Sequence, residues 1–165
     1  MGKAVNRGFD KVSGGKGPSK SADWVSMMQE RPKDKPFFFW FASSDAHRGW
    51  ALNDKAPLYK PEDIEVPPYL YDGPVTRKDF AEYMHEVSRT DYYMGQLRAE
   101  LKRQGIEKDT YIIYMTDNGR PFPRCKTRLY DSGIRTPFLI ARPGTIVPSE
   151  THSLISSIDI SATIL

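Results

Sequence analysis

The feature that most constrains the fold of this chain is a solid apolar run that ends abruptly in polar residues. Residues 111–115 are Tyr-Ile-Ile-Tyr-Met, and Thr-Asp-Asn-Gly follows directly. A run of aromatic and β-branched residues without a polar position is typical of a strand covered on both faces in an α/β sheet. Ligands of open α/β sheets bind beyond the carboxyl ends of the strands. The run therefore predicts a buried strand with a candidate site at its end.

Two polar side chains, Asp117 and Asn118, occupy that strand end. Their oxygens are hard donors of the kind that calcium and magnesium prefer. Gly119 allows the backbone to turn sharply behind them. The same three residues are also common in ordinary turns, and for the tripeptide alone a turn is the better interpretation. The choice between a metal site and a turn depends on the residues around them.

A second apolar run repeats this arrangement. Residues 36–42, Pro-Phe-Phe-Phe-Trp-Phe-Ala, have the length and composition of a strand and open into Ser-Ser-Asp-Ala-His-Arg. His47 and Arg48 lie in this polar stretch. A lone histidine after a strand is more often a loop residue than a catalytic group. A third strand is predicted at residues 136–142, which precede a Pro-Gly turn.

The longest helical signal covers residues 76–104, in which apolar residues recur at spacings of three and four. Thr76 is the expected N-cap, with Asp79 in the capping-box position. Gly105 is the expected stop, and His85 is expected on the solvated face of the helix. Shorter helices are predicted at residues 21–31 and 157–165.

Strands interspersed with helices predict one α/β domain over residues 1–165, with a sheet of parallel character. Residues 1–20 are rich in Gly, Lys and Ser and are expected to be loop. The Gly-Gly-Lys-Gly within them lacks the spacing of a phosphate-binding loop. Residues 49–75 contain five prolines, which predict a long surface connection without long helices.

Composition narrows the class of protein. Hydrophobic residues at 39% and charged residues at 27% are ordinary globular values. The net charge of +3, from scattered basic residues, gives no sign of nucleic-acid binding. Cys125 is the only cysteine, which excludes an internal disulfide and a multi-cysteine metal site, and it is expected to be an inert loop thiol. No apolar run approaches a membrane span, and no signal-peptide pattern follows Met1.

Residues 117–144, DNGRPFPRCKTRLYDSGIRTPFLIARPG, resemble the corresponding stretch of the sulfatases in the alkaline-phosphatase-like superfamily. The Pro-Phe-Pro that precedes Thr127, Leu129 and Tyr130 is most similar to the heparan N-sulfatase (sulfamidase)-like branch. The resemblance implies an alkaline-phosphatase-like α/β sandwich with a largely parallel sheet flanked by helices. It extends over the whole chain, so the chain is expected to be an internal fragment of a catalytic domain, incomplete at both ends.

The resemblance also implies roles for individual residues. Asp117 and Asn118 match the family residues that bind calcium, and Lys126 matches the cation that contacts the sulfate. His47 matches the histidine of the family's Asp-Pro-His, which contacts the sulfate or the leaving group, although the proline is replaced here. Arg48 matches the sulfamidase-like branch, where a substrate-binding role is expected. His47 and Lys126 are therefore the candidate catalytic residues.

The family nucleophile is a formylglycine made from the Cys or Ser of a Cys/Ser-x-Pro-x-Arg motif. Residues 125–128, Cys-Lys-Thr-Arg, lack its proline. The formylglycine and the remaining calcium ligands are therefore expected outside this chain, and the chain alone is expected to be inactive. The implied activity is hydrolysis of sulfuric esters or sulfamates on a sulfated sugar or glycosaminoglycan-like substrate, with neither nucleic acid nor membrane as a partner. The implied location is periplasmic, secreted or lysosomal.

Two alternatives stay open. A phosphatase or phosphodiesterase of the same superfamily would need a Ser or Thr nucleophile and two zinc ions, and the single Asp-Asn pair without a histidine-rich metal set argues against it. The other alternative is a non-catalytic relative that keeps the fold. A geometric prediction accompanies the sulfatase hypothesis. If the two strands before His47 and Asp117 are parallel, these residues, Asn118 and Lys126 should converge on one cleft.

Overall fold

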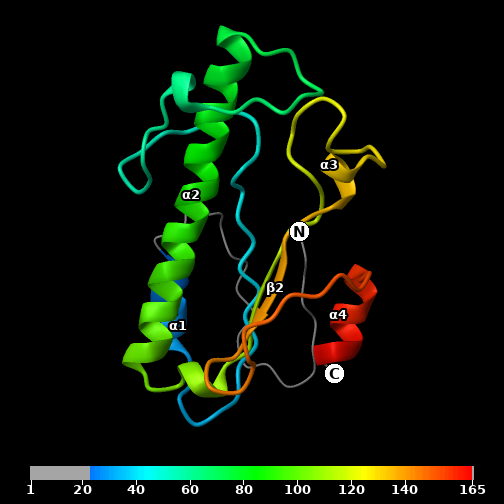
Figure 1. Cartoon of the computed structure of the whole chain (residues 1–165). Helices are drawn as coiled ribbons and strands as arrows, with labels where there is room; N and C mark the ends of the chain where they lie inside the picture. The colour runs from blue at the N-terminus through cyan, green and yellow to red at the C-terminus, as the bar shows by residue number, and fades with distance from the viewer. Residues whose placement is uncertain (1–22, 165) are drawn as a thin grey trace.

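The computed structural model of the chain describes residues 23–164, so the loop predicted at residues 1–20 lies outside the described residues. Figure 1 shows the order of the elements along the chain. They are the helix α1 (Asp23–Glu30), the 3₁₀ helix η1 (Pro61–Asp63), the helix α2 (Pro74–Arg103), the 3₁₀ helix η2 (Glu107–Asp109), the strand β1 (Ile112–Met115), the short helix α3 (Asp131–Ile134), the strand β2 (Phe138–Ala141) and the helix α4 (Ser157–Ile164).

The helix α2 is the longest element, and its 30 residues give it a length of about 45 Å. The helix predicted here is confirmed, but its first turn differs from the prediction. Pro74 occupies the first helical position and Gly73, in an extended conformation, is the N-cap. Proline suits this position because its fixed φ is already helical and its missing N–H has no partner there anyway. Asp79 is consequently free of any capping role and binds side chains of another segment.

The prediction that His85 lies on a solvated face is wrong. Its side chain is fully buried, because the proline-rich connection folds over this face of α2. His85 Nε2 accepts a hydrogen bond from the Asn53 N–H at 3.1 Å, and its Nδ1 lies 3.0 Å from the Pro57 carbonyl oxygen. This pair of contacts fits the tautomer with the proton on Nδ1. The connection expected at residues 49–75 is thus fixed to the helix by a histidine.

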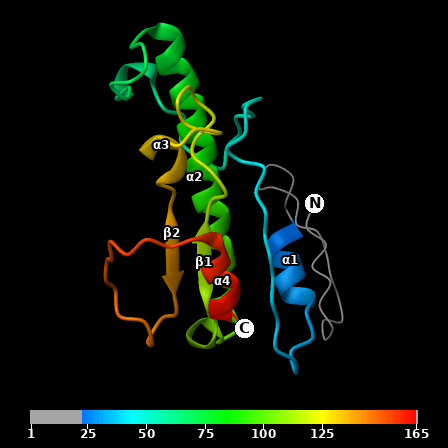
Figure 2. The same cartoon turned by 90° about the vertical axis from the view of Figure 1, so that its right-hand side faces the viewer.

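The described sheet has two strands, β1 and β2, and they are antiparallel. The register pairs Ile112 with Ala141 and Met115 with Phe138. The sequence predicted a largely parallel sheet, and for this pair of strands the prediction is wrong. The physical reason is the connection: residues 116–137 fold into a compact loop and α3 at the end where β1 finishes, so β2 starts from that same end and runs back (Figure 2). A parallel partner would need a crossover that returns to the opposite end.

Residues 36–42, the other predicted strand, form an extended segment outside this two-stranded sheet. Alternate aromatic rings of this segment line up on one face. The ring centroid of Phe39 lies 5.6 Å from that of Phe37 and 5.3 Å from that of Phe41. That spacing is expected for extended backbone, in which residues two apart share a face. Phe41 also packs 5.1 Å from Trp24 of α1. The strand predicted at residues 36–42 is therefore wrong, because this extended segment pairs with no other strand in the described structure. The segment packs against α1 instead, and the two lie side by side in Figure 2.

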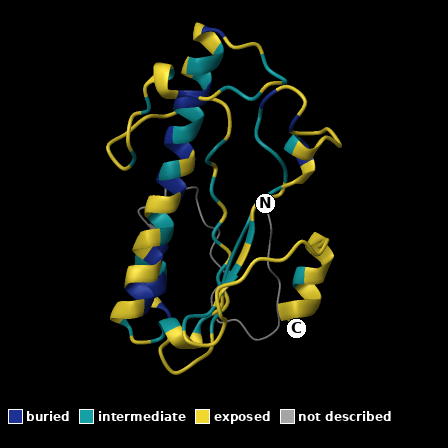
Figure 3. Cartoon of the chain, in the orientation of Figure 1, coloured by how far each residue is buried: buried dark blue, intermediate teal, exposed yellow. Residues whose placement is uncertain are grey.

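The principal core lies at the N-terminal half of α2. There the helix meets the connection of residues 49–75 and the loop that follows β1, and the buried residues of α2 are coloured dark blue in Figure 3. The cluster consists of Ile64, Phe80, Ala81, Phe122 and Cys125. Cys125 is a fully buried free thiol within this loop, in keeping with the inert role expected for it. Among the described residues, no helix is both long enough and apolar enough to cross a membrane.

Candidate functional site

The segment that carries His47 is held by Arg89, a fully buried arginine of α2. The Arg89 guanidinium forms a bidentate ion pair with Asp45, through Nε at 2.7 Å and Nη2 at 2.9 Å. The same guanidinium donates from Nη1 to the carbonyl oxygen of Ala51. Asp45 and Ala51 stand on either side of His47 in the chain, so one buried cation fixes both ends of the segment.

Glu86 completes this buried network. Its Oε1 accepts hydrogen bonds from the Ala51 N–H at 2.8 Å and from Arg89 Nη2 at 3.1 Å. Its Oε2 is buried and has no hydrogen-bond partner in the described structure. Burial raises the pKa of Glu86, and the nearby Asp45 carboxylate raises it further. Two carboxylates therefore share one buried arginine, which makes that arginine the critical member of the group.

Arg48 joins the segment of His47 to the loop after β1. Its Nη1 and Nη2 bind the Asp79 carboxylate at 3.0 and 2.6 Å, and its Nε donates to the Pro121 carbonyl oxygen at 2.9 Å. The guanidinium also lies 4.9 Å from the centre of the Phe122 ring. Trp50 supports the same junction, because its Nε1 donates to Asp79 at 2.7 Å. The residue next to His47 is thus in direct contact with the loop that begins at Asp117.

The loop after β1 is folded tightly on itself. The Gly119 N–H donates to the Gly133 carbonyl oxygen at 2.9 Å, which closes the loop at its base. A side chain on Gly133 would overlap the carbonyl oxygens of Cys125 and Arg128, so only glycine fits there. The Lys126 N–H donates to the Arg120 carbonyl oxygen at 3.1 Å, which closes a compact turn over residues 120–126.

The predicted site residues fall on these two loops. His47 is exposed, and its Nδ1 lies 3.1 Å from the carbonyl oxygen of Arg48. Asp117 and Lys126 are exposed and Asn118 is half-buried. The hydrogen bond from Arg48 to Pro121 brings the two loops together, but His47 and Lys126 form no hydrogen bond with each other in the described structure. The structure thus joins the loops and leaves His47, Asp117 and Lys126 open to solvent.

The calcium expected at Asp117 and Asn118 requires more oxygen ligands than these two side chains supply. Calcium takes six to eight oxygens. Among the residues that the structure describes, no group of three or more His, Cys, Asp or Glu side chains is placed to hold a metal ion. The carboxylate and amide oxygens of the pair have the right chemistry, and the side chain of Asp117 is accessible. The pair therefore fits calcium as one part of a larger ligand set.

Sequence reasoning missed Arg89, Asp45 and Asp79, which hold the two loops. Asp45 and Arg89 are 44 positions apart and Arg48 and Asp79 are 31 apart. Charged residues in a helical pattern are ordinarily solvated, so nothing in the periodicity of α2 marks Arg89 as buried. The one signal in the sequence was Asp45, an acidic residue two positions before the candidate histidine His47.

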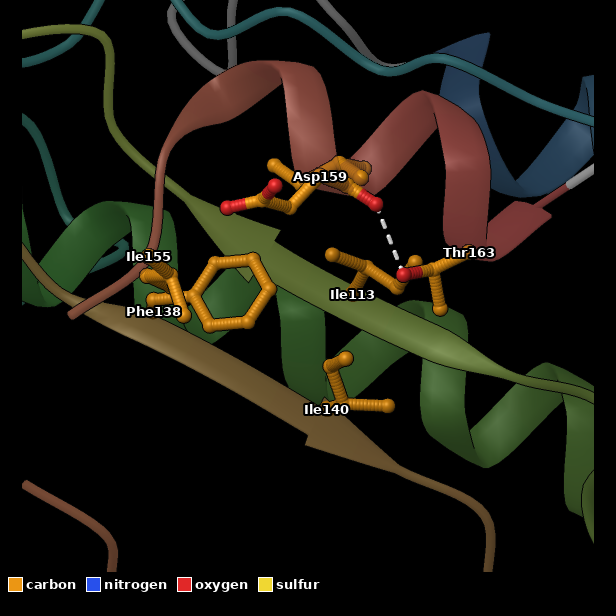
Figure 4. Close-up of a pocket in the computed structure, with 7 residues that line it drawn as sticks. Ile113, Phe138, Ile140, Ile155, Asp159 and Thr163 are labelled. Atoms are coloured by element: carbon orange, nitrogen blue, oxygen red, sulfur yellow. Dashed lines mark hydrogen bonds between the residues drawn. The ribbon is translucent and has the colours of Figure 1, made fainter. Parts of the chain in front are cut away.

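A separate cavity of about 170 Å³ lies between α4 and the sheet, away from these loops (Figure 4). Its walls are apolar apart from Asp159 and Thr163. Both polar residues hydrogen-bond at α4, since the Asp159 carboxylate caps the Ser156 N–H at 2.6 Å and the Thr163 hydroxyl donates to the Asp159 carbonyl oxygen at 2.7 Å. The cavity contains none of the predicted site residues.

Comparison with known proteins gives a consistent set of matches. A family model described as "Sulfatase" matches residues 19–165. The chain is 30% identical to the human protein named N-sulphoglucosamine sulphohydrolase, in a match that covers 86% of this chain and 33% of that protein. It is 30% identical to an "Ulvan-active sulfatase" of Formosa agariphila, over 67% of this chain and 19% of that protein. It is 28% identical to an "Endo-4-O-sulfatase" of Bacteroides thetaiotaomicron, over 82% of this chain and 29% of that protein. The chain thus spans a third or less of the length of these relatives.

Proposed function

The chain belongs to the sulfatase family, and from this premise we propose that it forms part of a hydrolase that cleaves sulfuric esters or sulfamates on sulfated sugars. The observation that carries the proposal is the hydrogen bond from Arg48 to Pro121, because it joins the loop of His47 to the loop of Asp117 and Lys126. Relatives named for N-sulphoglucosamine and for ulvan support a sugar as the carrier of the sulfate.

Lys126 and Arg48 would bind the anionic part of the substrate. The ammonium of Lys126 is exposed and has no ion pair in the described structure, so it can serve as a compact positive charge against a sulfate oxygen. Arg48 already uses three donors on Asp79 and Pro121, but its side chain is 47% exposed. Any contact of Arg48 with substrate would therefore come from its remaining N–H groups while the junction stays intact.

His47 would supply the proton for the leaving group or stabilise the charge that develops on it. An imidazole suits this task because its ring nitrogens can both donate and accept protons. Nε2 of His47 has no hydrogen-bond partner in the described structure, whereas Nδ1 faces the Arg48 carbonyl oxygen. The Nδ1 proton would be held by that carbonyl, so the proton given to the leaving group would be one carried on Nε2.

Asp117 and Asn118 would hold part of a calcium site, which would supply positive charge against the sulfate oxygens. The formylglycine nucleophile of the family would come from a segment outside this chain, since no Cys/Ser-x-Pro-x-Arg motif occurs in it. The residues of this chain would then bind the sulfate, neutralise its charge and handle the proton, while the attack on sulfur depends on the other segment.

The experiment is a kinetic comparison in a protein that carries this chain together with the nucleophile motif. An aryl sulfate and an N-sulfated glucosamine serve as substrates. His47→Ala should lower kcat by about 10²- to 10⁴-fold, the usual contribution of a positioned proton donor. Lys126→Ala should lower kcat/KM, and the exposed Lys78→Ala should change neither quantity. Absence of turnover with both substrates, or full activity of His47→Ala, would rule out the proposed function.

A further inference from the structure

One loop of the described structure carries an excess of positive charge. Residues 117–135 hold five of the 24 basic residues and two of the 21 acidic ones, which gives this segment a net charge of +3. We call residues 117–135 the cationic loop. It follows β1, contains α3 and includes Lys126 of the candidate site.

The cations of this loop differ from the other arginines in their partners. Elsewhere in the described structure, most arginines form an ion pair with a carboxylate: Arg48, Arg77, Arg89, Arg98, Arg103 and Arg142. Within the cationic loop, no basic side chain forms an ion pair with any described carboxylate. Arg124, Lys126, Arg128 and Arg135 are also exposed. Their charge is therefore available to an external anion.

Backbone contacts fold this loop compactly. The hydrogen bond between Gly119 and Gly133 closes the loop, and the Ser132 hydroxyl donates to the Arg124 carbonyl oxygen at 2.8 Å. Gly133 is packed directly against the carbonyl oxygen of Arg128. The cations therefore belong to one short, closed segment. Like charges on such a segment repel each other, and a bound polyanion would relieve that repulsion.

We propose that the cationic loop is a binding surface for a polyanionic sugar chain, in which Arg124, Arg128 and Arg135 contact anionic groups next to the sulfate that Lys126 would hold. The choice of a sugar rests on the proposed function. Arginine suits this task because its planar fork binds two oxygens of one sulfate or carboxylate at once. Tyr130, 53% exposed and 5.1 Å from the Arg124 guanidinium, adds an apolar ring face against which a sugar can pack. The preferred substrate would then be a chain with several anionic groups.

The test is binding of a heparin octasaccharide to the 165-residue chain, measured by calorimetry at several salt concentrations. The triple variant Arg124→Gln, Arg128→Gln and Arg135→Gln keeps Lys126. It should bind at least about tenfold more weakly, as expected for the loss of three exposed charge-assisted contacts, and its affinity should depend less on salt. The control variant Lys60→Gln, Lys78→Gln and Lys108→Gln removes the same charge from exposed positions outside the loop. It should bind within about threefold of the wild type.

Two further measurements keep the outcome decisive. The first is a double variant, Arg128→Gln and Arg135→Gln, for the case in which Arg124→Gln disturbs the fold of the loop. Neither side chain has a hydrogen-bond or ion-pair partner in the described structure, so this variant should fold normally. A desulfated octasaccharide should bind far more weakly than the sulfated one. Equal weakening in the loop and control variants would overturn the proposal, as would equal affinity for a short DNA duplex, which would indicate a polyanion surface of another class.

The outcome is separable from that of the proposed function, because binding needs no nucleophile. Loss of octasaccharide binding in the loop variant, together with no sulfatase turnover by the complete protein, would support the surface and refute the catalytic function. Turnover that depends on His47, together with unchanged octasaccharide binding by the loop variant, would support the catalytic function and refute the binding surface.

Discussion

At the scale of single residues, Arg89 holds the candidate site together without belonging to it. It is the common partner of two buried carboxylates, Asp45 and Glu86, and of the Ala51 carbonyl oxygen. The replacement of an arginine at such a position leaves two buried acidic groups without a counter-charge. Breaking a buried ion pair in this way is far more costly than removing an exposed one, because the remaining charge cannot be solvated.

Arg89→Met should therefore lower the free energy of unfolding by about 3–5 kcal/mol, although methionine fills much of the same volume. Arg98→Met is the matched control, since Arg98 is 60% exposed and pairs with Glu107 at 3.4 Å, and it should cost less than about 1 kcal/mol. Urea denaturation of both variants measures the difference. Similar losses in the two variants would contradict the role assigned to Arg89.

At the scale of elements, the carboxylate of Glu100 is one of the groups that attach α1 to the C-terminal end of α2, together with a hydrogen bond from Gln104 to the Met28 carbonyl oxygen. Glu100 accepts hydrogen bonds from Arg103 at 2.6 and 2.7 Å, from Gln104 at 2.6 Å, and from Gln29 of α1 at 3.1 Å. The Arg103 guanidinium is the main reason that the pKa of Glu100 falls from 4.5 to about 2, and the two glutamines lower it further. The folded state therefore favours the ionised form of this carboxyl.

The contribution of Glu100 to stability should be complete above pH 4.5 and should disappear as the pH falls towards 2, because the folded pKa lies below the unfolded one. Glu100→Gln cannot titrate, so its Tm should fall less steeply than that of the wild type between pH 4.5 and 2. Thermal melts between pH 4.5 and 2 measure the Tm of both proteins. The control variant Glu150→Gln, at an exposed position, should follow the wild type. If the Tm of Glu100→Gln falls with pH as steeply as that of the wild type, Glu100 does not cause the loss of stability.

The cationic loop is an element whose shape depends on Gly133. A Cβ at this position would overlap two backbone carbonyl oxygens, those of Cys125 and Arg128, which cannot move aside as a flexible side chain could. Gly133→Ala should therefore destabilise the chain by about 1–3 kcal/mol, the usual range for overpacking. Gly95→Ala, in the middle of α2 with no described atom within 4 Å of its Cβ position, should instead stabilise it by up to about 1 kcal/mol. Urea denaturation curves of the two variants measure whether the free energy of unfolding falls in Gly133→Ala and rises in Gly95→Ala.

At the scale of the whole molecule, the chain joins a long helix, a proline-rich connection and the cationic loop around one aromatic core. The ring centroids of Phe80 and Phe122 lie 4.1 Å apart, and those of Trp50 and Phe122 lie 6.4 Å apart. The same core therefore supports both candidate loops. The loops are thus built on packed elements rather than on free termini. The same core therefore supports the loop proposed to bind an anion and the segment of the proposed proton donor, His47.

The 165-residue chain by itself should show no turnover of an aryl sulfate or an N-sulfated glucosamine, because no residue in it occupies a Cys/Ser-x-Pro-x-Arg motif. Prolonged incubation at high protein concentration, with detection of free sulfate, is a sensitive assay. Turnover above background that disappears in His47→Ala would show that this chain holds a nucleophile of another kind.

The sequence by itself determined the features that depend on local pattern. Helical spacing identified α2, the apolar run identified β1, and the family motif identified the sulfatase family. The roles of Asp117, Asn118 and Lys126 stay predictions. The tertiary structure decided three things that no local pattern encodes. It set β2 antiparallel to β1, because a compact loop returns the chain at the same end of the sheet. It buried His85 and Arg89 under the connection, and it used Asp79 to hold Arg48 instead of capping a helix. Each of these depends on partners between 23 and 44 positions away, and contacts over such distances are fixed by how the elements pack rather than by the spacing of residues along one element.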